Sequence, residues 1–359
     1  MGIAEPTVKC GYGPRSHYNS LARSFELEGH RVVRAEPAEL YSADLDILVG
    51  VEFDFEGMPK RYRGRAYTTD VCVLGRCACR GYISSKDDAG KFIFGAAPDR
   101  RGQQTDMSGV KVIGYYSDEE GILTAMDLLE NDDDDHSYER DRFRDYCDNL
   151  HAVVDFTVEK DRRAVLDAIA DEGNATEGVS ILLGGAPPMF LGDLVREGAK
   201  LTGRFREMGL RATLFVGNAP EEMRRDLDEL GDSVRYLMPY DEYMHEVLSA
   251  DVIITKPGWN TISDLIYYAQ ISSRSPHYIL MSDWRSIPEL IAQNVLERRG
   301  FTLEREFNRI EQISEMMQEL QGGGLKSAKD HTRELARSIG IRSVVEIILA
   351  DYENAGGLT

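Results

Sequence analysis

The stretch ADVIITKPGWNTISD, residues 250–264, contains the pattern that decides the fold. Its run DVIIT, residues 251–255, has the length and β-branched composition of a buried strand. The turn KPG follows, and a helix is predicted from Thr261, which is a residue type that caps helix starts. A strand, a glycine turn and a helix start in this order favour binding of an anionic group, because the N–H groups and dipole of a helix N-terminus attract negative charge.

Two further features extend this hypothesis. Asp264 stands one helical turn into the predicted helix, where a carboxylate can accept hydrogen bonds from vicinal ribose hydroxyls. The alternative is that Asp264 only compensates the helix dipole, an effect of about 0.3 to 1 kcal/mol. A second strand is followed by the turn LLGGAPP, in which Gly184 and Gly185 either let a phosphate approach the backbone or simply allow a tight turn.

The chain divides into two regions of different pattern. A length of 359 residues exceeds what one core usually supports, so we expect an N-terminal domain at residues 1–160, a C-terminal domain at 175–325 and terminal helices at 326–359. The second half alternates apolar strands with amphipathic helices, which is typical of a parallel sheet covered on both faces. The predicted strands are 179–183, 212–217, 234–238, 251–255 and 277–281, and the predicted helices are 188–208, 221–230, 241–250, 261–269, 328–338 and 342–352.

The first half opens with a predicted strand–helix–strand unit made of residues 7–10, 20–30 and 31–35. Its middle part has poor helical patterns, so long loops or an antiparallel hairpin are expected there. A helix that begins at Asp161 is expected to connect the two halves. Further strands are predicted at residues 45–49, 66–74, 91–94, 111–115 and 152–156.

Composition excludes several classes of protein. The formal net charge is −20, from 62 acidic and 42 basic residues, which disfavours binding to the polyanions nucleic acid and anionic lipid. No apolar run reaches the roughly 18 residues of a membrane span, and no secretory signal is present, so a cytoplasmic protein is expected. The spread of acidic residues suits a protein of an acidic proteome in high salt, and the aspartates at residues 132–135 are predicted to form a solvated loop.

The five cysteines suggest reduced thiols rather than a disulfide framework. Cys72, Cys77 and Cys79 could form a thiolate metal site with Cys10 or Cys147. Their spacing lacks the paired CxxC motifs of structural zinc sites, and alternating burial in a strand explains it equally well. We therefore expect no metal.

LSADVIITKPGWNTISDL resembles the segment ADxVITKxGxxTxxEL of the MurG-like and diacylglycerol-glucosyltransferase-like families. ILLGGAP, VRYLMPYDEYMHEVL and PELIAQNVLERRGF resemble other stretches of their nucleotide domain. CGYGPRSHYNSLARSFELEGHRVV resembles the first glycine loop and helix of their N-terminal domain. The resemblance implies the GT-B fold, an α/β architecture of two Rossmann-like domains facing a central cleft, with C-terminal helices, and a UDP-sugar bound mainly by the C-terminal domain.

The resemblance also assigns roles to single positions. Met238 would line the base, Asp264 would hold the ribose where the family usually has glutamate, and Glu289 and Asn294 would face the donor sugar. Trp259 stands where the family has small residues, and it would either stack on a sugar or close the site. The full donor-binding set is Gly184, Gly185, Met238, Lys256, Gly258, Trp259, Asn260, Thr261, Asp264, Glu289 and Asn294, and the N-terminal loop for acceptor or diphosphate contributes Gly11, Gly13 and Arg15.

His17 is the predicted catalytic residue. Inverting transfer needs a base that removes the proton of the acceptor hydroxyl, and histidine suits that task. The alternatives are that His17 steadies the leaving phosphates or makes only local hydrogen bonds at a helix start.

The predicted function is a glycosyltransferase that moves a sugar from a nucleotide sugar, UDP-linked by resemblance, to a hydroxyl of an unknown small-molecule or lipid acceptor. The nucleotide sugar is a co-substrate, and no cofactor is expected. Two alternatives stay open: a nucleotide-sugar hydrolase or epimerase of the same fold, and a non-catalytic binding or accessory protein.

Overall fold

A computed structural model of the chain describes residues 1–4, 12–51, 57–69, 82–86, 92–95, 109–114, 150–154, 156–172, 178–183, 188–217, 223–224, 227–282, 287–304 and 309–356. The chain forms two compact units. The first comprises Met1–Arg162, Ser286–Ile291 and Gly340–Thr359, and the second comprises Arg163–Arg285 and Ala292–Ile339. The segment 326–359, which we expected to stand apart as terminal helices, is thus divided at Gly340 between the two units.

The first unit is built on a six-stranded parallel sheet with the order β2-β1-β3-β4-β7-β8. The chain runs outward from β1 to β2, then returns to the other side of β1 for the remaining strands, as in doubly wound folds. Its strands are β1 (Gly2–Ala4), β2 (Val33–Ala35), β3 (Leu48–Val51), β4 (Ala66–Thr69), β7 (Val110–Gly114) and β8 (Leu150–Val153).

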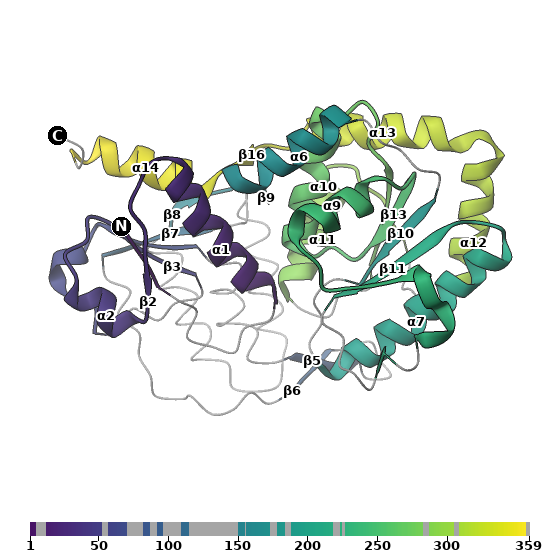
Figure 1. The fold of residues 1–359 in the computed structure, drawn as a ribbon, viewed down its shortest axis with the longest axis horizontal. Coiled ribbons are helices and arrows are strands. Elements are labelled where there is room, and N and C mark those ends of the chain that lie inside the picture. The colour runs from purple at the N-terminus through teal and green to yellow at the C-terminus, as the bar shows by residue number, and fades with distance from the viewer. Residues whose placement is uncertain are drawn as a thin grey trace. The chain divides into compact units, whose positions relative to one another are not determined.

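Helices and short strand pairs complete this unit (Figure 1). Leu21, Ala22 and Phe25 on one face of α1 are fully buried, as the spacing of these apolar residues requires. The other elements are α1 (Tyr12–Leu27), α2 (Pro37–Ser42), the 3₁₀ turn η1 (Lys60–Tyr62), α14 (Val344–Asn354), the antiparallel hairpin β5 (Tyr82–Lys86) with β6 (Phe92–Gly95), and the parallel pair β9 (Phe156–Thr157) with β16 (Ile341–Arg342).

The second unit contains a six-stranded parallel sheet with the order β12-β11-β10-β13-β14-β15. The chain leaves β10 in one direction for β11 and β12, then returns to β13 and continues the other way, so the winding direction reverses between β10 and β13. The strands are β10 (Val179–Leu182), β11 (Ala212–Gly217), β12 (Val234–Tyr236), β13 (Val252–Thr255), β14 (His277–Met281) and β15 (Leu303–Glu304).

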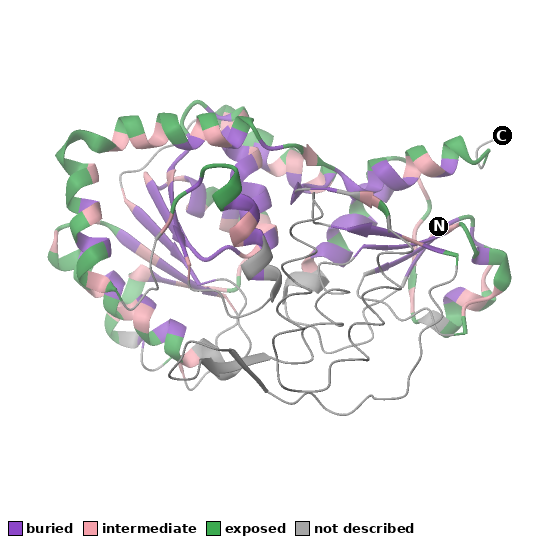
Figure 2. Cartoon of the chain, turned by 180° about the vertical axis from the view of Figure 1, so that it is seen from behind, coloured by how far each residue is buried: buried purple, intermediate pink, exposed green. Residues whose placement is uncertain are grey.

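Helices cover both faces of this sheet, which explains why its strands are apolar on both sides. One face packs against α7 and α12 around a core that includes Leu201, Phe205 and Met317. On the other face, the Ser180 hydroxyl donates to a carbonyl of α9 and the Tyr278 hydroxyl donates to one of α10. The central strands β10 and β13 are buried along their whole length, whereas the outer surfaces of α12 and α13 are exposed (Figure 2). The helical segments are α7 (Pro188–Glu207), η2 (Asp228–Ser233), α9 (Tyr240–Leu248), α10 (Trp259–Ile271), α12 (Ile310–Glu319), η3 (Leu320–Gly324) and α13 (Leu325–Arg337). Two more helices, α6 (Lys160–Glu172) and α11 (Ile287–Arg298), begin in the first unit and end in the second.

Most predicted elements of the second unit are confirmed, and the expected antiparallel hairpin of the first unit is β5 with β6. Two helical segments differ from the prediction. The first helix begins at Tyr12 instead of residue 20, because proline is tolerated in a first helical turn and Pro14 lies there. The expected helix 221–230 is replaced at its end by the 3₁₀ segment η2, and its residues 221–222 and 225–226 lie outside the described part. The predicted strand 7–10 also lies outside it.

Candidate active site

The two turns singled out in the sequence follow neighbouring strands of the second unit. Leu182, the last residue of β10, pairs with Thr255, the last residue of β13. Both turns therefore leave the carboxyl edge of the sheet at the same level, at the point where the winding direction reverses. Ligands of open α/β sheets bind at this place, because backbone N–H groups and helix N-termini face a crevice there. Gly184 and Gly185 themselves lie outside the described residues.

The junction between β13 and α10 is shorter than the sequence suggested. Helix α10 begins at Trp259 with Gly258 as its N-cap, so the prediction that Thr261 caps the helix is wrong. Thr261 and Asn260 lie in the first turn instead. The helix starts early because Gly258 has extended backbone angles, φ −69° and ψ 123°, which fit an N-cap without any side-chain contribution. Within the described part of the chain, no side-chain hydrogen bond caps this helix start.

Gly258 is a glycine that the conformation of the chain does not require. Its φ of −69° is accessible to every residue type. A Cβ atom at this position would meet no described atom within 4 Å. Open space beside the backbone of a helix N-cap is the environment that close approach of a ligand needs.

Three side chains of the junction are buried. Lys256 and Asp264 are each only 1 % exposed and Trp259 is 6 % exposed. A buried ammonium and a buried carboxylate in one strand–helix junction are unusual, since charged groups lose hydration on burial and need compensating partners. A ribose contact by Asp264 would require its neighbours to move, because the carboxylate belongs to a helix face that packs inward.

The remaining predicted donor residues occupy two other places. Met238 is half-buried and follows β12 at the carboxyl edge of the second sheet, beside Leu237, which is 54 % exposed. Glu289 and Asn294 both lie on α11, where Glu289 is buried in the first turn and Asn294 is half-buried.

His17 lies in the second turn of α1 in the first unit and is 8 % exposed. Its Nε2 is 2.9 Å from the Thr69 hydroxyl, at the carboxyl end of β4. Burial, and in second place the positive charge of Arg162, lower the pKa of His17 to about 3. The imidazole is therefore neutral at pH 7, the form that a general base needs.

The expected N-terminal glycine loop is only partly described. Gly11 lies outside the described residues. Gly13 and Arg15, which we placed in a loop, belong to the first turn of α1, so that part of the prediction is wrong. Glycine is tolerated at a helix start, where few intrahelical hydrogen bonds exist yet.

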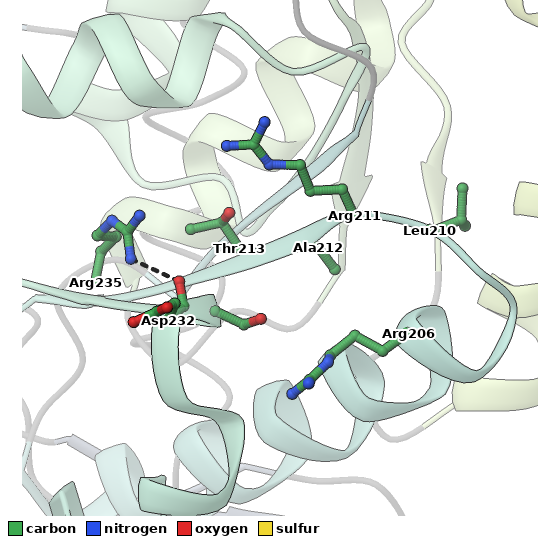
Figure 3. Close-up of a pocket in the computed structure, with 8 residues that line it drawn as sticks. Arg206, Leu210, Arg211, Ala212, Thr213, Asp232 and Arg235 are labelled. Carbon is green, nitrogen blue, oxygen red and sulfur yellow. Dashed lines mark hydrogen bonds between the residues drawn. The ribbon is translucent and has the colours of Figure 1, made fainter.

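A pocket of about 330 Å³ lies at the opposite edge of the second sheet, where β11 and β12 begin. Arg206, Arg211 and Arg235 contribute guanidinium groups to it. Arg206 and Arg211 lie on opposite sides of the β11 ribbon, and Arg235 donates to the Asp232 carbonyl (Figure 3). Arg235 also pairs with Glu246 at 2.7 Å. The three charges do not converge on one point, so this pocket is a poorer anion site than the helix start at Gly258.

Two further observations concern the described residues. No group of three or more His, Cys, Asp or Glu side chains gathers there as metal ligands. Every helix in that part of the chain is too short or too polar to cross a lipid bilayer. The cysteines 72, 77 and 79 and the aspartates 132–135 lie outside it.

Two doubly wound, parallel α/β units in one chain define the GT-B class of fold. Among solved structures, the chain is similar to MurG from Acinetobacter baumannii, with a TM-score of 0.50 and 9 % identity over 98 % of this chain and 99 % of that one. It also matches the spinosyn rhamnosyltransferase SpnG, with a TM-score of 0.49 and 12 % identity over the same shares of the two chains. No family model and no curated protein matches the sequence.

The sequence did not reveal the surroundings of His17. Thr69 is 52 positions away in the chain, and no local pattern links the two residues. Arg162 belongs to the EKDR segment at the start of α6, which reads locally as an ordinary charged helix start. Only the pairing of strands and helices in the folded unit brings these groups together.

Proposed function

We propose that the chain is a nucleotide-sugar-dependent glycosyltransferase whose donor diphosphate binds at the junction of β13 and α10. The observation that carries this proposal is the open space at Gly258, a glycine with ordinary backbone angles that caps a helix at the reversal point of a doubly wound sheet. The MurG likeness supports it at the level of fold.

Charge explains why this position suits a diphosphate. The protein has a net charge of −20, so an anionic ligand must find locally favourable groups. The N-terminus of a 13-residue helix offers N–H donors and roughly half a positive charge. Lys256 adds an ammonium directly after the strand. These groups stabilise the negative charge that develops on a departing nucleoside diphosphate.

In the proposed reaction, the acceptor hydroxyl oxygen attacks the anomeric carbon of the donor sugar. The carbon–oxygen bond to the diphosphate breaks, the electron pair leaves with the nucleoside diphosphate, and the hydroxyl proton passes to a ring nitrogen of His17. A histidine with a pKa near 3 is neutral but weakly basic. The proposal therefore requires that anionic substrate raises this pKa in the complex, as nearby negative charge does.

The binding step is tested by calorimetry with a panel of nucleotides and nucleotide sugars, comparing the wild type with Gly258→Ala. We expect at least about tenfold weaker binding in the variant, equivalent to about 1.4 kcal/mol, and an unchanged melting temperature. Gly203→Ala is the matched control, since Gly203 lies in α7, also has open space around it, and is remote from the junction. Absence of binding by any nucleotide sugar to the wild type would sink the proposal.

The chemical step is tested by release of nucleoside diphosphate with and without candidate acceptors. Transfer predicts release that depends on the acceptor and falls at least about 100-fold in His17→Gln, the usual effect of removing a general base. NMR of the products without acceptor distinguishes hydrolysis or epimerisation. Tight binding with no turnover would instead identify a binding protein. Trp259→Gly would then test whether the buried indole closes the site.

A further inference from the structure

Four consecutive residues, Glu159, Lys160, Asp161 and Arg162, each interact with a different part of the first unit. We call residues 159–162 the anchor segment. It contains the last residues of the first unit before the chain enters the second one, which begins at Arg163. Asp161 and Arg162 bind or influence helix α1, Lys160 pairs with a residue just beyond the end of α1, and Glu159 binds the start of α14.

Glu159 holds the N-terminus of α14. Its carboxylate accepts hydrogen bonds from the Ser343 hydroxyl at 2.6 Å and from the backbone N–H groups of Val344 at 2.8 Å and Val345 at 3.4 Å. Glu159 is 2 % exposed and Ser343 is 1 % exposed. Because α14 follows the point where the chain returns to the first unit at Gly340, this carboxylate ties the outgoing and returning chain segments together.

Asp161 binds two turns of α1, and Lys160 pairs with a residue that follows this helix. The Asp161 carboxylate accepts hydrogen bonds from the Ser20 hydroxyl at 2.5 Å and from the Ser24 hydroxyl at 3.2 Å. Ser24 accepts a hydrogen bond from the backbone N–H of Asp161 in return. Lys160 pairs with Glu28, just beyond the end of α1, at 2.8 Å.

Arg162 acts on the first turns of the same helix. Its side chain is 7 % exposed, like His17 at 8 %, and its charge acts on the imidazole. The Nε2 of His17 is 2.9 Å from the Thr69 hydroxyl of β4. Among the described residues, Arg162 is the charged group with a resolved effect on the His17 ring, while Asp161 is occupied by the two serines one and two turns further along α1.

We propose that the anchor segment is a positioning device for His17, in which Glu159 fixes the start of α14 and Asp161 fixes the axial position of α1, the helix that carries His17. This inference rests on the proposed function for its chemical meaning, since His17 is the base there. Its structural content is independent of that function. The hydrogen bonds of Asp161 with Ser20 and Ser24 oppose sliding or rotation of α1 relative to the anchor segment. This matters for catalysis because a general base must be positioned to within a fraction of an ångström.

The test uses the full-length chain with isotope-labelled histidine and follows the His17 ring by NMR between pH 4 and pH 8. His17→Gln identifies the resonance. In Arg162→Met we expect the His17 pKa to rise by at least about half a unit, because a positive charge has been removed from a buried neighbour. Arg162→Lys should keep the pKa low. Arg196→Met, which removes an exposed arginine of α7 that pairs with Asp193, should leave the His17 pKa unchanged.

A second variant tests the connection to α14. In Glu159→Gln, hydrogen exchange at the amides of Val344 and Val345 should accelerate at least about tenfold, because an amide accepts through a single oxygen. If Arg162→Met does not fold, Arg162→Gln removes the same charge and retains hydrogen-bond donors. Unchanged amide exchange in folded Glu159→Gln, together with an unchanged His17 pKa in a folded variant without charge at position 162, would overturn the proposal.

Activity separates this inference from the proposed function. If nucleotide sugars are turned over, Arg162→Met should alter kcat and its pH profile more than KM, and Arg162→Lys should restore much of the rate. If no variant or wild type shows turnover while the His17 pKa shifts as expected, the positioning device stands and the proposed function fails. If nucleotide sugars are turned over but the His17 pKa does not shift in Arg162→Met and amide exchange is unchanged in Glu159→Gln, the proposed function stands and the positioning device fails.

Discussion

At the scale of single residues, burial shifts the pKa of His17 and the pKa of Glu159 away from their ordinary values. Both shifts favour the uncharged form. The pKa of His17 falls to about 3 through burial and the charge of Arg162. The pKa of Glu159 rises to about 7 because burial outweighs its three hydrogen bonds. These shifts have opposite consequences for stability as the pH changes.

His17 should make the protein less stable in acid. Below pH 6.5 the unfolded chain protonates this histidine while the folded chain does not, so stability falls as the pH drops from 6.5 towards 3. By pH 5 the loss is about 2 kcal/mol. Urea unfolding of wild type and His17→Gln at pH 8 and pH 5 measures it. The wild type should lose more stability than the variant, and parallel losses would contradict the assigned burial of a neutral imidazole.

Glu159 should act in the opposite direction. Its contribution to stability is present below pH 4.5, where both states are protonated, and is lost as the pH rises through about 7. The difference in free energy of unfolding between wild type and Glu159→Gln should therefore be larger at pH 5 than at pH 8, by about 2 to 3 kcal/mol. A difference that is independent of pH would show that the carboxylate remains ionised throughout.

At the scale of elements, three glycines between α12 and α13 offer a matched comparison. Gly323 has φ +123°, a conformation that side chains with a Cβ rarely adopt, and it marks the kink at which η3 joins the two helices. The three glycines of QGGG, residues 321–324, favour an interruption of the helix because glycine is a poor helix former. Gly322 has neither a positive φ nor any described atom within 4 Å of a Cβ.

We expect Gly323→Ala to destabilise the protein by about 1 to 3 kcal/mol, because alanine must adopt a strained backbone conformation. Gly322→Ala should be neutral or stabilising by up to about 1 kcal/mol, because alanine is the better helix former. Thermal and urea unfolding of the two variants measure the effect. Equal effects of the two substitutions would contradict the kinked geometry.

Helix starts were the elements that sequence patterns placed least well. The hydrophobic spacing of α10 predicted its interior, but its first residue is Trp259 and its cap is Gly258. A backbone N-cap needs no particular side chain, so Thr261 was a misleading signal. The same reasoning applies to α1, which begins at Tyr12 before Gly13 and Pro14.

At the scale of the whole molecule, the net charge of −20 predicts a dependence on salt. Repulsion among acidic residues opposes the compact state, and salt screens it over a Debye length that falls from about 10 Å at 0.1 M to about 3 Å at 1 M. We expect the melting temperature to rise by on the order of 5 °C between 0.05 M and 1 M KCl, equivalent to about 1 to 2 kcal/mol.

The loss of stability that salt causes by screening attractive ion pairs is small. Salt also screens exposed ion pairs such as Arg34 with Glu26 at 3.0 Å, and such pairs contribute at most about 1 kcal/mol each. Scanning fluorimetry measures the melting temperature in KCl. Sucrose at equal osmolality is the control that separates charge screening from solvent exclusion. A melting temperature that falls with KCl would show that attractive pairs dominate.

The sequence by itself determined the fold class, because alternating apolar runs and amphipathic helices leave few arrangements other than a doubly wound parallel sheet. It also determined the two glycine turns and the strand–turn–helix order at residues 250–264, which are local features encoded by neighbouring residues. Only the tertiary structure decided that β10 and β13 end side by side, that Lys256 and Asp264 are buried, and that residues 159–162 hold α1 and α14. These facts depend on contacts between segments up to 186 positions apart, which arise from packing and strand order and leave no trace in local patterns.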